Sequence, residues 1–423
     1  MYLESALSRP WRDLAIVRHI GWGRRVACAG LSLLALAWST LEQAPTITLS
    51  PPEAVAEGIV LHRSADASVL DPQAPAGPVG MALVRLDPSR VTLSTSLARR
   101  CSPARETVLD IANREQAVVA INAGFFQPRG APAGLLKRDG RWIGATARAR
   151  GIAVFPATVR GGPARVVFMR ATVEADLRFR ARLKTRTVHV DRLSPEEPLT
   201  GLSLFGAPCA EAEDAAKAGA TGAAPLPPAS PALQRTSWRI GRDGRVAAVT
   251  PPGRAEPAFV DGVGERLTYR GAALPSDLAR LGPGTRVTVS PRIGSPDAVV
   301  LRDAPDAVGG AGLLVSGGVA VTDWSMERFS PAFAADRHPR SVVGVAADGA
   351  IWLIAVDGRQ PSHSVGMSFT ELQRLCAALG LRDALNLDGG GSTTLVVQGR
   401  IVNRPSDLTG PRQVSDAIVV RKR

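Results

Sequence analysis

The residues best suited to chemistry lie in one short segment, residues 386–393 (NLDGGGST). An apolar run brings an amide and a carboxylate to its end, and three glycines then turn the chain. Because side chains alternate along a strand, Asn386 and Asp388 are expected to share one face. Consecutive glycines are costly in conformational entropy and suit positions where the backbone bends sharply or approaches a ligand. The segment predicts a ligand site at Asp388, with an ordinary Asp-Gly hairpin turn as the alternative.

Two other apolar runs also end in polar residues. One finishes with Asn122, and another runs into Asp357, which glycine and then Arg359 follow. A sheet that collects polar residues at its strand ends can build a site on a rigid support. We therefore expect these residues and Asp388 to contribute to one site.

Two turn signals predict which residues face each other at the ends of hairpins. Asp348-Gly349 separates two apolar runs, and Asp-Gly is a common two-residue hairpin turn. A second turn is expected at Gln398-Gly399. If both are two-residue turns, the facing pairs are Arg340 with Asp357, a guanidinium beside a carboxylate, and Thr393 with Arg404.

The secondary-structure pattern predicts many short strands and few helices. From Gly58 to about Val190, short apolar runs alternate with glycine and proline. A short helix is expected over residues 107–112. A second helix should begin at Ser368, with Glu371 completing a capping box. Its apolar stripe would consist of Leu372, Leu375, Cys376 and Leu379, and Gly380 would end it.

The composition excludes several classes of function. The formal charge is +13, but only four of the basic residues are lysines and the arginines are scattered. No basic helix, zinc-finger spacing or RNA-binding motif is present, so a nucleic acid is not the expected partner. The charge leaves anionic substrates or an anionic envelope surface as the functional option. The absence of HExxH argues against a zinc hydrolase of that class.

The four cysteines form no CxxC pair and have no metal-ligand spacing. Cys376 lies on the apolar stripe of the expected helix, so a core position is predicted for it. A disulfide between Cys101 and Cys209 is one possibility that the spacing leaves open.

The chain divides into three parts by composition, and the third contains an insertion. Residues 1–41 are interpreted as a signal peptide or an N-terminal membrane anchor, because the apolar run 26–41 follows Arg24 and Arg25. Residues 42–56 are expected to be a linker and residues 57–423 one domain. Within that domain, residues 210–232 are rich in alanine, glycine and proline, which predicts a flexible insertion. This organisation favours export to the periplasm or cell envelope, with membrane attachment through residues 26–41 possible.

Taken together, these motifs resemble those of the phosphodiester glycosidase family. The matching pieces occur in the family's order over roughly residues 80–423: residues 121–126 (INAGFF), 337–344 (RHPRSVVG), 356–359 (VDGR), 386–393 (NLDGGGST), 402–407 (VNRPSD) and 412–417 (RQVSDA). Asp416 stands where the family often has asparagine, and Ser341 where it often has threonine. The resemblance implies an α+β fold with a mixed, largely antiparallel sheet and flanking helices.

The resemblance also implies a reaction, the hydrolysis of a sugar–phosphate bond at the anomeric carbon. A phosphate leaves as a stabilised anion, so it needs less help from a general acid than an alkoxide does. Asp388 is our first candidate for the catalytic carboxylate, as nucleophile or general base, and Asp357 the second; either could instead only cap its turn. Arg340 is expected to clamp the phosphate, with a structural salt bridge to Asp357 as a compatible alternative.

The remaining candidates would bind the substrate. Asn122 and Asn386 would hold sugar hydroxyls or water, and Ser392 and Thr393 would hold a phosphate oxygen beside glycine amides. A serine nucleophile is disfavoured, because no histidine–aspartate partnership is indicated. No cofactor or metal site is predicted, although acidic strand ends could hold Ca²⁺ or Mg²⁺. The full predicted substrate-binding set is Asn122, Arg340, Arg359, His363, Asn386, Gly389, Gly390, Ser392, Thr393 and Arg404.

The sequence thus predicts an exported hydrolase that cleaves a glycosyl-1-phosphodiester resembling a GlcNAc-1-phosphodiester. Two alternatives remain open. The first is an envelope protein that binds glycans with the same pocket and has no catalytic activity. The second is a phosphoesterase that cuts the phosphate side of the diester.

Overall fold

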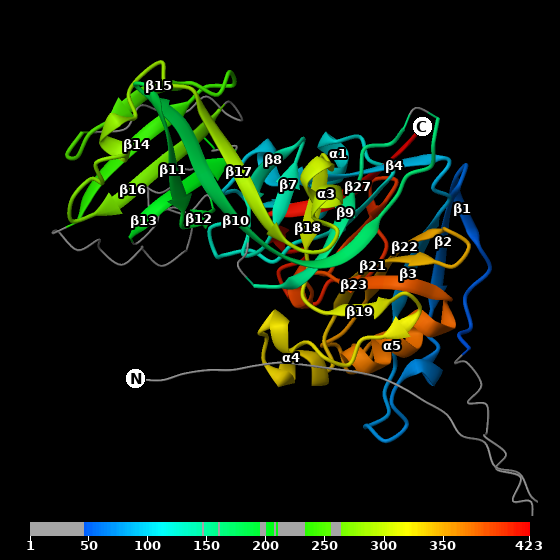
Figure 1. Cartoon of the computed structure of the whole chain (residues 1–423). Helices are drawn as coiled ribbons and strands as arrows, with labels where there is room; N and C mark the ends of the chain where they lie inside the picture. The colour runs from blue at the N-terminus through cyan, green and yellow to red at the C-terminus, as the bar shows by residue number, and fades with distance from the viewer. Residues whose placement is uncertain are drawn as a thin grey trace, which may run out of the picture. The chain divides into compact units, whose positions relative to one another are not determined.

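The computed structural model describes residues 46–145, 148–159, 161–194, 200–206, 209, 233–254 and 264–423. Strands are the main regular structure of these residues, and nearly all strand pairs are antiparallel (Figure 1). The helices described are short: α1 (Val108–Arg114), α3 (Ala298–Asp303), α4 (Pro331–Ala335) and α5 (Phe369–Ala378). The predicted α+β class with helices flanking the sheet is therefore wrong. One face of the central sheet packs against another sheet, where the prediction expected a helix.

The central sheet has the strand order β1-β2-β3-β22-β21-β23-β19-β20, and every neighbouring pair is antiparallel. Its strands are β1 (Glu53–Ala56), β2 (Ile59–Ser64), β3 (Met81–Leu86), β19 (Leu313–Ser316), β20 (Val319–Ala320), β21 (Arg340–Ala346), β22 (Ile351–Val356) and β23 (Leu381–Asn386). Strand β1 lies inside the segment expected to be a linker, so the end of that segment belongs to the sheet.

Both faces of the central sheet are covered, which explains why its strands are continuously apolar. On β22, Ile354 packs into the cluster that contains Leu372 and Leu375 of α5. Its neighbour Leu353 points the other way and packs with Ile121 and other residues of a second sheet. A strand buried on both faces has no polar face to alternate with its apolar one.

The second sheet has the order β25-β24-β6-β27-β4. It brings together strands that lie far apart in the sequence: β4 (Val91–Leu97), β6 (Val119–Asn122), β24 (Leu395–Val397), β25 (Arg400–Ile401) and β27 (Asp416–Lys422). The ends of β6 and β27 meet there, with Asn122 opposite Ala417. This sheet and β23 together position the residues of the candidate site.

A 15-residue strand, β10 (Val167–Ala181), links two further sheets. One end of β10 pairs with β9 (Arg150–Phe155), and the other pairs with β11 (Lys184–Val190) and β17 (Val287–Gly294). A separate five-stranded sheet has the order β12-β13-β16-β14-β15. Its strands are β12 (Arg192–Leu193), β13 (Gly201–Gly206), β14 (Gln234–Ile240), β15 (Val246–Thr250) and β16 (Glu265–Gly271). The sheet packs against β10 through an apolar cluster that includes Leu177, Leu204 and Trp238.

The smaller elements complete the connections. Two short hairpin strands, β7 (Leu136–Arg138) and β8 (Arg141–Gly144), pair with each other, and β18 (Asp306–Gly309) joins β7 to β9. The pair β5 (Glu106–Thr107) and β26 (Gln413–Val414) lies apart from these sheets. The 3₁₀ turns are η1 (Ala67–Val69), η2 (Ala98–Arg100), η3 (Leu278–Arg280), η4 (Ser325–Glu327) and η5 (Gly390–Ser392).

Several local predictions are confirmed. The Ser368 hydroxyl accepts from the Glu371 N–H, and the Glu371 carboxylate accepts from the Ser368 N–H, which forms the predicted capping box. Helix α1 begins at the Thr107 cap. A disulfide joins Cys101 to Cys209, the pairing that the sequence left open. Cys376 is buried, as its place on the apolar stripe predicted.

One hairpin register differs from the prediction. Arg340 pairs with Val356 and not with Asp357. The turn holds an extra residue, because Gly349 adopts a φ of +86° and the Ala346 N–H bonds to the Ala350 carbonyl. A shift of one residue moves side chains to the opposite face, so Arg340 does not face Asp357. The other predicted register is confirmed, since Val396 pairs with Ile401.

The predicted leader or anchor (residues 1–41, with its apolar run 26–41) and the predicted insertion (residues 210–232) lie outside the described residues. Within the part of the chain that is described, no helix has the length and apolarity needed to cross a membrane.

Candidate functional site

The candidate site is centred on Asp388, which follows the end of β23. The Asp388 N–H donates to the Ala123 carbonyl at 2.9 Å, just beyond β6. The Asn122 side chain donates to the Asp388 carbonyl at 2.6 Å. In turn, the Asn122 side-chain oxygen accepts from the Ser341 hydroxyl at 2.7 Å and the Thr394 N–H at 3.1 Å. The buried Asn122 side chain thus links the two sheets at the glycine turn by hydrogen bonds to both of them.

The environment of the Asp388 carboxyl favours its protonated form. Burial raises its pKa to about 7, although the Ser392 hydroxyl, the Gly389 N–H and Arg412 act in the opposite direction. The Gly389 N–H donates to one carboxyl oxygen at 2.9 Å. The nearby carboxyl of Asp416 adds to the rise. A carboxylate whose pKa lies near neutral pH is suited to accept a proton during a reaction.

The three glycines are required because other groups approach the turn closely. A Cβ on Gly389 would lie 2.6 Å from the Pro339 carbonyl oxygen. One on Gly391 would lie 2.1 Å from the Asp407 carboxylate. Gly390 has a φ of +60°, and a Cβ there would lie 3.1 Å from the Arg359 guanidinium. The turn is therefore covered by charged side chains, as a ligand-binding turn would be.

The backbone amides of this turn are mostly committed to protein acceptors. The Gly390 N–H donates to the Pro339 carbonyl, and the N–H groups of Ser392 and Thr393 donate within the turn. Side-chain oxygens are the freer groups. Among the described residues, the buried oxygens of Asn386, Thr393 and Thr394 have no hydrogen-bond partner. Buried polar groups are normally paired, so these oxygens point to a polar ligand or water.

Arg359 is exposed and lies over Gly390. Its backbone has a φ of +58°, which is unusual for a residue other than glycine. Its charge contributes to lowering the pKa of both Arg340 and His338. Within the described part of the chain, no acidic side chain forms an ion pair with it. Arg359 therefore offers an exposed guanidinium over the glycine turn that follows Asp388.

Arg340, the predicted phosphate clamp, is buried and committed to the protein. Its guanidinium donates to the carbonyls of Met367, Phe333 and Asp336 at 2.8–2.9 Å. It also lies 5.1 Å from the Phe333 ring and 4.8 Å from the Phe369 ring. Burial, followed by the charge of Arg359, lowers its pKa to about 10. The predicted contact with Asp357 is absent among its described bonds, so Arg340 braces the strand end instead.

Asp357 organises a second group of side chains. One of its carboxylate oxygens accepts from the Asn403 side chain at 3.0 Å and the Arg404 N–H at 2.9 Å. The other bonds to Nε2 of His363 at 2.8 Å. Asn403 also donates to the Thr393 carbonyl at 3.1 Å, which links this group to the glycine turn.

The pair of His363 and Asp357 was not predicted from the sequence. A tight turn creates it: the N–H groups of His363 and Ser364 both donate to the Gln360 carbonyl, which brings the histidine back over the strand end. The only signal was the Pro361-Ser362 turn sequence between them. The arrangement resembles the histidine–aspartate pair of a catalytic triad, in which the carboxylate orients the imidazole ring.

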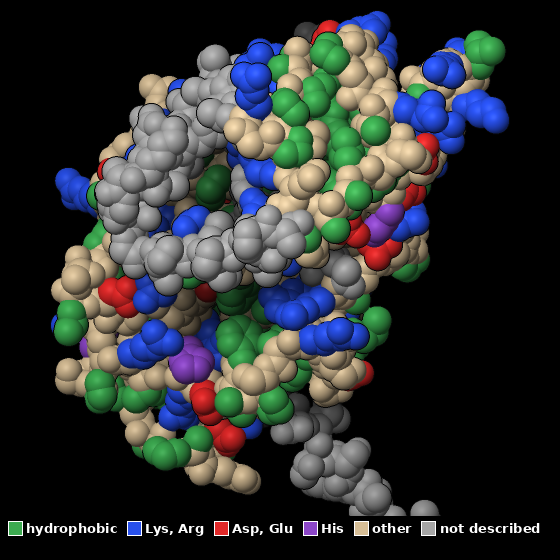
Figure 2. Space-filling view, turned by 90° about the vertical axis from the view of Figure 1, so that its left-hand side faces the viewer, with side chains coloured by type: hydrophobic (Ala, Val, Ile, Leu, Met, Phe, Trp, Pro, Cys, Tyr) green, Lys and Arg blue, Asp and Glu red, His purple; other side chains and the backbone are tan. Residues whose placement is uncertain are grey.

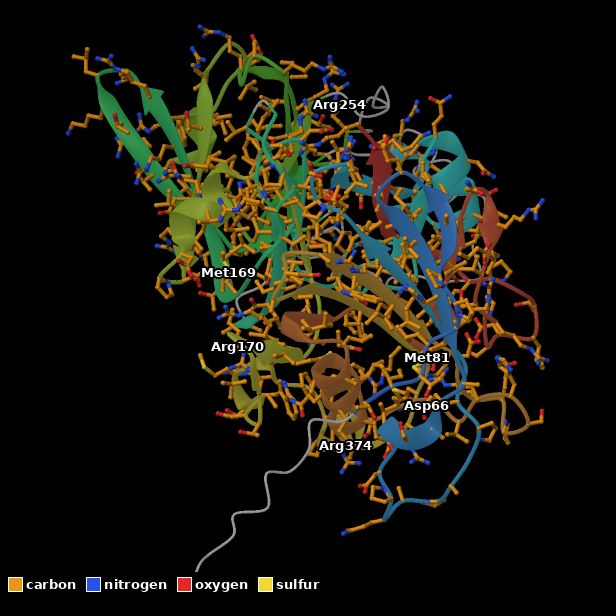
Figure 3. All side chains as sticks on the ribbon, turned by 90° about the vertical axis from the view of Figure 1, so that its right-hand side faces the viewer. Asp66, Met81, Met169, Arg170, Arg254 and Arg374 are labelled. Carbon is orange, nitrogen blue, oxygen red and sulfur yellow. A yellow bond between two sulfur atoms is a disulfide. The ribbon has the colours of Figure 1, made fainter. Side chains whose placement is uncertain are left out.

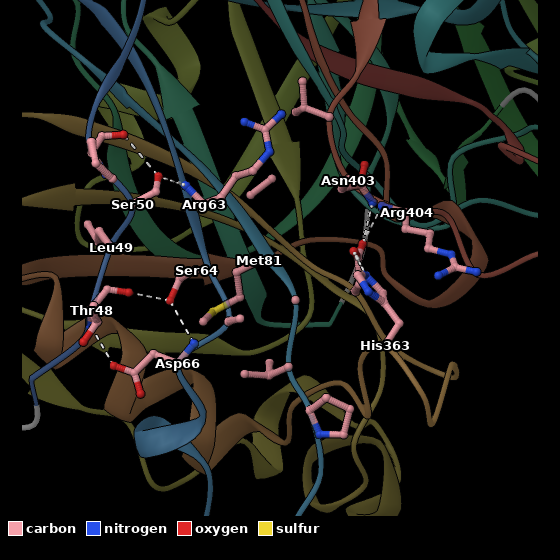
Figure 4. A pocket seen from close by; sticks show the side chains of 18 residues that line it. Thr48, Leu49, Ser50, Arg63, Ser64, Asp66, Met81, His363, Asn403 and Arg404 are labelled. Carbon is pink, nitrogen blue, oxygen red and sulfur yellow. Dashed lines mark hydrogen bonds and ion pairs between the residues drawn. The ribbon is translucent and has the colours of Figure 1, made fainter.

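A cavity of about 1010 Å³ opens beside this group. Asp357, His363, Asn403 and Arg404 form one wall (Figure 4). The opposite wall comes from residues 48–51 and the end of β2, including Arg63. Asp66 and Met81 lie at the same end of the β2–β3 pair (Figure 3). Asp388 does not line this cavity, so the glycine turn and the cavity are neighbouring parts of the site, joined through Asn403.

Four residues around the glycine turn were absent from the predicted site, namely Asp416, Arg412, Asp407 and His338. Asp416 is buried, and its carboxyl accepts from the Gly124 N–H at 2.7 Å and from the Ser415 hydroxyl. Burial raises the pKa of Asp416 as well. Arg412 and Asp407 form a two-bond ion pair at 2.8 and 3.0 Å over Gly391. His338 lies near Arg340 and Arg359, and burial lowers its pKa. All four residues lie in motifs that match the phosphodiester glycosidase family, and this was the sequence signal that could have identified them.

In the described ranges, no group of three or more histidine, cysteine, aspartate or glutamate side chains is arranged to hold a metal ion. On the face shown in Figure 2, lysine and arginine side chains occur in several groups among acidic and hydrophobic ones.

Comparison with known proteins gives partial matches. The chain is 38% identical over 71 residues to the SPbeta prophage-derived uncharacterized protein YomE of Bacillus subtilis, covering 17% of this chain and 11% of that protein. It is 33% identical over 89 residues to N-acetylglucosamine-1-phosphodiester α-N-acetylglucosaminidase of Mus musculus, covering 20% of this chain and 17% of that protein. The matches thus span less than a fifth of either relative.

A solved structure of a hypothetical protein from Synechocystis has the same fold, with a TM-score of 0.64 and 24% identity over 88% of this chain and 64% of that one. Residues 241–421 match the family model described as phosphodiester glycosidase. This range contains every predicted site residue except Asn122. The resemblance seen in the motifs is thus confirmed, because residues 241–421 are similar to the phosphodiester glycosidase family.

Proposed function

We propose that this protein hydrolyses the sugar–phosphate bond of a glycosyl-1-phosphodiester, with a GlcNAc-1-phosphodiester as the model substrate. The observation that carries the proposal is the group around Asp388. The Asp388 carboxyl, with a pKa of about 7, lies at a glycine turn over which the Arg359 guanidinium lies. Nearby buried side-chain oxygens have no hydrogen-bond partner among the described residues. The match of residues 241–421 to the phosphodiester glycosidase family model supports the same reaction class.

In the proposed reaction, Asp388 acts as a general base. Its ionised carboxylate takes a proton from a water molecule as the water oxygen bonds to the anomeric carbon. The bond between that carbon and the phosphate oxygen breaks, and the phosphomonoester leaves with the bonding electron pair. A carboxylate with a pKa of about 7 accepts a proton more readily than one with an ordinary pKa. Direct attack by Asp388 on the sugar is the alternative, and it would retain the anomeric configuration.

Arg359 replaces Arg340 as the proposed phosphate ligand. A guanidinium can bind two phosphate oxygens at once, and it stabilises the charge that develops on the leaving group. Arg340 has its donors committed to three carbonyls, whereas Arg359 is exposed beside the turn. The oxygens of Thr393 and Thr394 would then accept from, or donate to, the sugar.

Asp357 is proposed to position other groups and not to react. Its carboxylate is occupied by His363, Asn403 and Arg404, which leaves it little freedom to attack the substrate. Through these bonds it fixes the His363 ring at the cavity wall. His363 is then a binding group for the part of the substrate beyond the phosphate, and Arg404 lies beside it.

The proposed location is an oxidising compartment, the periplasm or cell envelope. The Cys101–Cys209 disulfide supports it, because disulfides persist outside reducing cytosol. The apolar run 26–41 after two arginines is consistent with export.

The test is a product analysis on the full chain with UDP-GlcNAc as the diester. We expect free GlcNAc and UDP from the wild type, and neither from Asp388→Asn. GlcNAc-1-phosphate and UMP would instead identify a phosphoesterase. Binding of the diester without turnover, even across a panel of sugars, would contradict hydrolysis and favour a glycan-binding protein.

A further inference from the structure

A second cavity, of about 470 Å³, lies away from the candidate site and shares no lining residue with the first cavity. Three separate parts of the chain form most of it: the end of β4 with η2, the β7–β8 hairpin, and the turn between β14 and β15. Its charged lining consists of four arginines and two acids, namely Arg100, Arg138, Arg141, Arg242, Glu115 and Asp139.

The acid deepest in this cavity is already neutralised by arginines. The Glu115 carboxylate accepts from Arg114 and Arg421, one on each oxygen. Burial acts to raise the pKa of Glu115, but the charges of Arg114, Arg421 and Arg138 outweigh it and hold the pKa below its usual value. Glu115 therefore stays ionised, and both of its carboxylate oxygens accept hydrogen bonds from Arg114 and Arg421. The Arg100 guanidinium lies 3.6 Å from Glu115, too far for a hydrogen bond.

Two of the lining arginines keep their guanidinium groups available. Arg138 is paired with Asp139 at 3.1 Å and Asp306 at 3.4 Å. The Arg100 side chain, in contrast, is 69% exposed, and within the described residues its one ion pair is the 3.6 Å contact with Glu115. Arg242 is exposed in the β14–β15 turn, and no ion pair to it is found within the described residues.

The backbone that carries Arg100 is strained. Arg99 and Arg100 have φ values of +49° and +60°, two successive left-handed residues that are not glycine. In this conformation the Cβ of a residue lies too close to the following carbonyl oxygen. The Cys101–Cys209 disulfide follows directly and anchors the segment. Strain of this kind persists where the surrounding structure holds it, and it is frequent at binding sites.

We propose that this cavity binds a phosphate group of the substrate glycan, at a point remote from the bond that is cleaved. Arg100 and Arg242 come from different elements and together could hold a single phosphate by charge-assisted hydrogen bonds. The identity of the ligand as a phosphorylated glycan rests on the proposed function, whereas anion binding as such rests on the cavity alone. A polymer with phosphate in each repeat could occupy both sites at once, which would strengthen binding through local concentration.

Anion binding is tested by calorimetric titration of the full chain with tripolyphosphate at low salt. The double variant Arg100→Gln/Arg242→Gln removes both available guanidiniums. The matched control Arg178→Gln/Arg180→Gln removes the same charge from the exposed side of β10, outside the cavity. We expect the first variant to bind about tenfold more weakly and the control to bind as the wild type does. Two results would overturn the proposal. Equal loss of affinity in both variants would show a general charge effect, and unchanged affinity in Arg100→Gln/Arg242→Gln would show that these arginines do not bind the anion.

The role in substrate binding has a separate readout. The cavity variant should hydrolyse UDP-GlcNAc at the wild-type rate, and its KM for a phosphodiester-linked glycan polymer should rise several-fold. An unchanged KM for the polymer would refute a role in substrate binding. If the wild type hydrolyses no diester, the proposed function fails, and the titration still decides whether the cavity binds anions.

Discussion

Replacing Asp388 with asparagine should abolish activity and stabilise the fold at alkaline pH. The reason is the raised pKa of this carboxyl. In the unfolded chain the carboxyl would titrate near 3.8, whereas in the folded protein the pKa is about 7. The folded state therefore holds the Asp388 proton more tightly, and ionising the group above neutral pH costs folding free energy.

The sign and size of the effect follow from the two pKa values. Below about pH 4 the carboxyl is protonated in both states, and its ionisation costs nothing. Between pH 4 and pH 7 the cost grows, and above pH 7 it is complete. The gap of about three units corresponds to roughly 4 kcal/mol. Because Asp388 keeps some exposure to solvent, we take this as an upper limit and expect about 1–4 kcal/mol.

The assay is denaturant unfolding of the wild type and Asp388→Asn at pH 4.5 and pH 8. The variant should gain stability relative to the wild type as the pH rises between these values. Asp348→Asn is a matched control, because the Ala350 N–H and Arg85 lower the pKa of Asp348 below its usual 3.8. Its carboxyl is then ionised in both the folded and the unfolded state over this range, so its stability relative to the wild type should be nearly the same at both pH values. In the wild type, kcat/KM should rise with pH through about 7, since the base must be ionised. A relative stability that is the same at both pH values would refute the buried, proton-holding state of Asp388.

Three further predictions concern other parts of the site and the fold. Arg359→Ala should raise KM for the diester at least tenfold while binding of free GlcNAc is unchanged in a titration; parallel loss of both would show that Arg359 is structural. Arg340→Ala should lower the unfolding free energy by several kcal/mol, because three carbonyls lose their donor, and full retention of stability would contradict its bracing role. Cys101→Ser/Cys209→Ser should lower stability by up to about 4 kcal/mol in non-reducing denaturation and should not respond to reductant. Cys376→Ser keeps the disulfide, so reductant should destabilise it as much as it destabilises the wild type.

The parts of the site that sequence could predict are those set by local chemistry. Strand alternation and glycine geometry pointed to Asp388, and the turn at Gln398-Gly399 fixed a register correctly. The capping box of Ser368 and Glu371 was also predictable, because both partners lie within one helical turn.

What could not be predicted depends on contacts between distant segments. One extra residue in the Asp348-Gly349 turn moved Arg340 away from Asp357. An Asp-Gly pair alone does not determine the length of its turn. The bond between His363 and Asp357 required the path of a loop. The fold class failed for a similar reason, because an apolar strand does not reveal whether a helix or another sheet will cover it.

The order of strands in the second sheet has a consequence for how the protein acquires activity. Strand β27 lies between β6 and β4, and Asp416 at its start bonds to Gly124, 292 residues earlier in the sequence. A nascent chain that ends before β27 leaves the edges of β6 and β4 unpaired and lacks the carboxyl that acts on Asp388. Catalytic competence is thus expected to appear abruptly, late in synthesis, and ribosome-stalled fragments should be inactive and prone to pair their open edges with other chains.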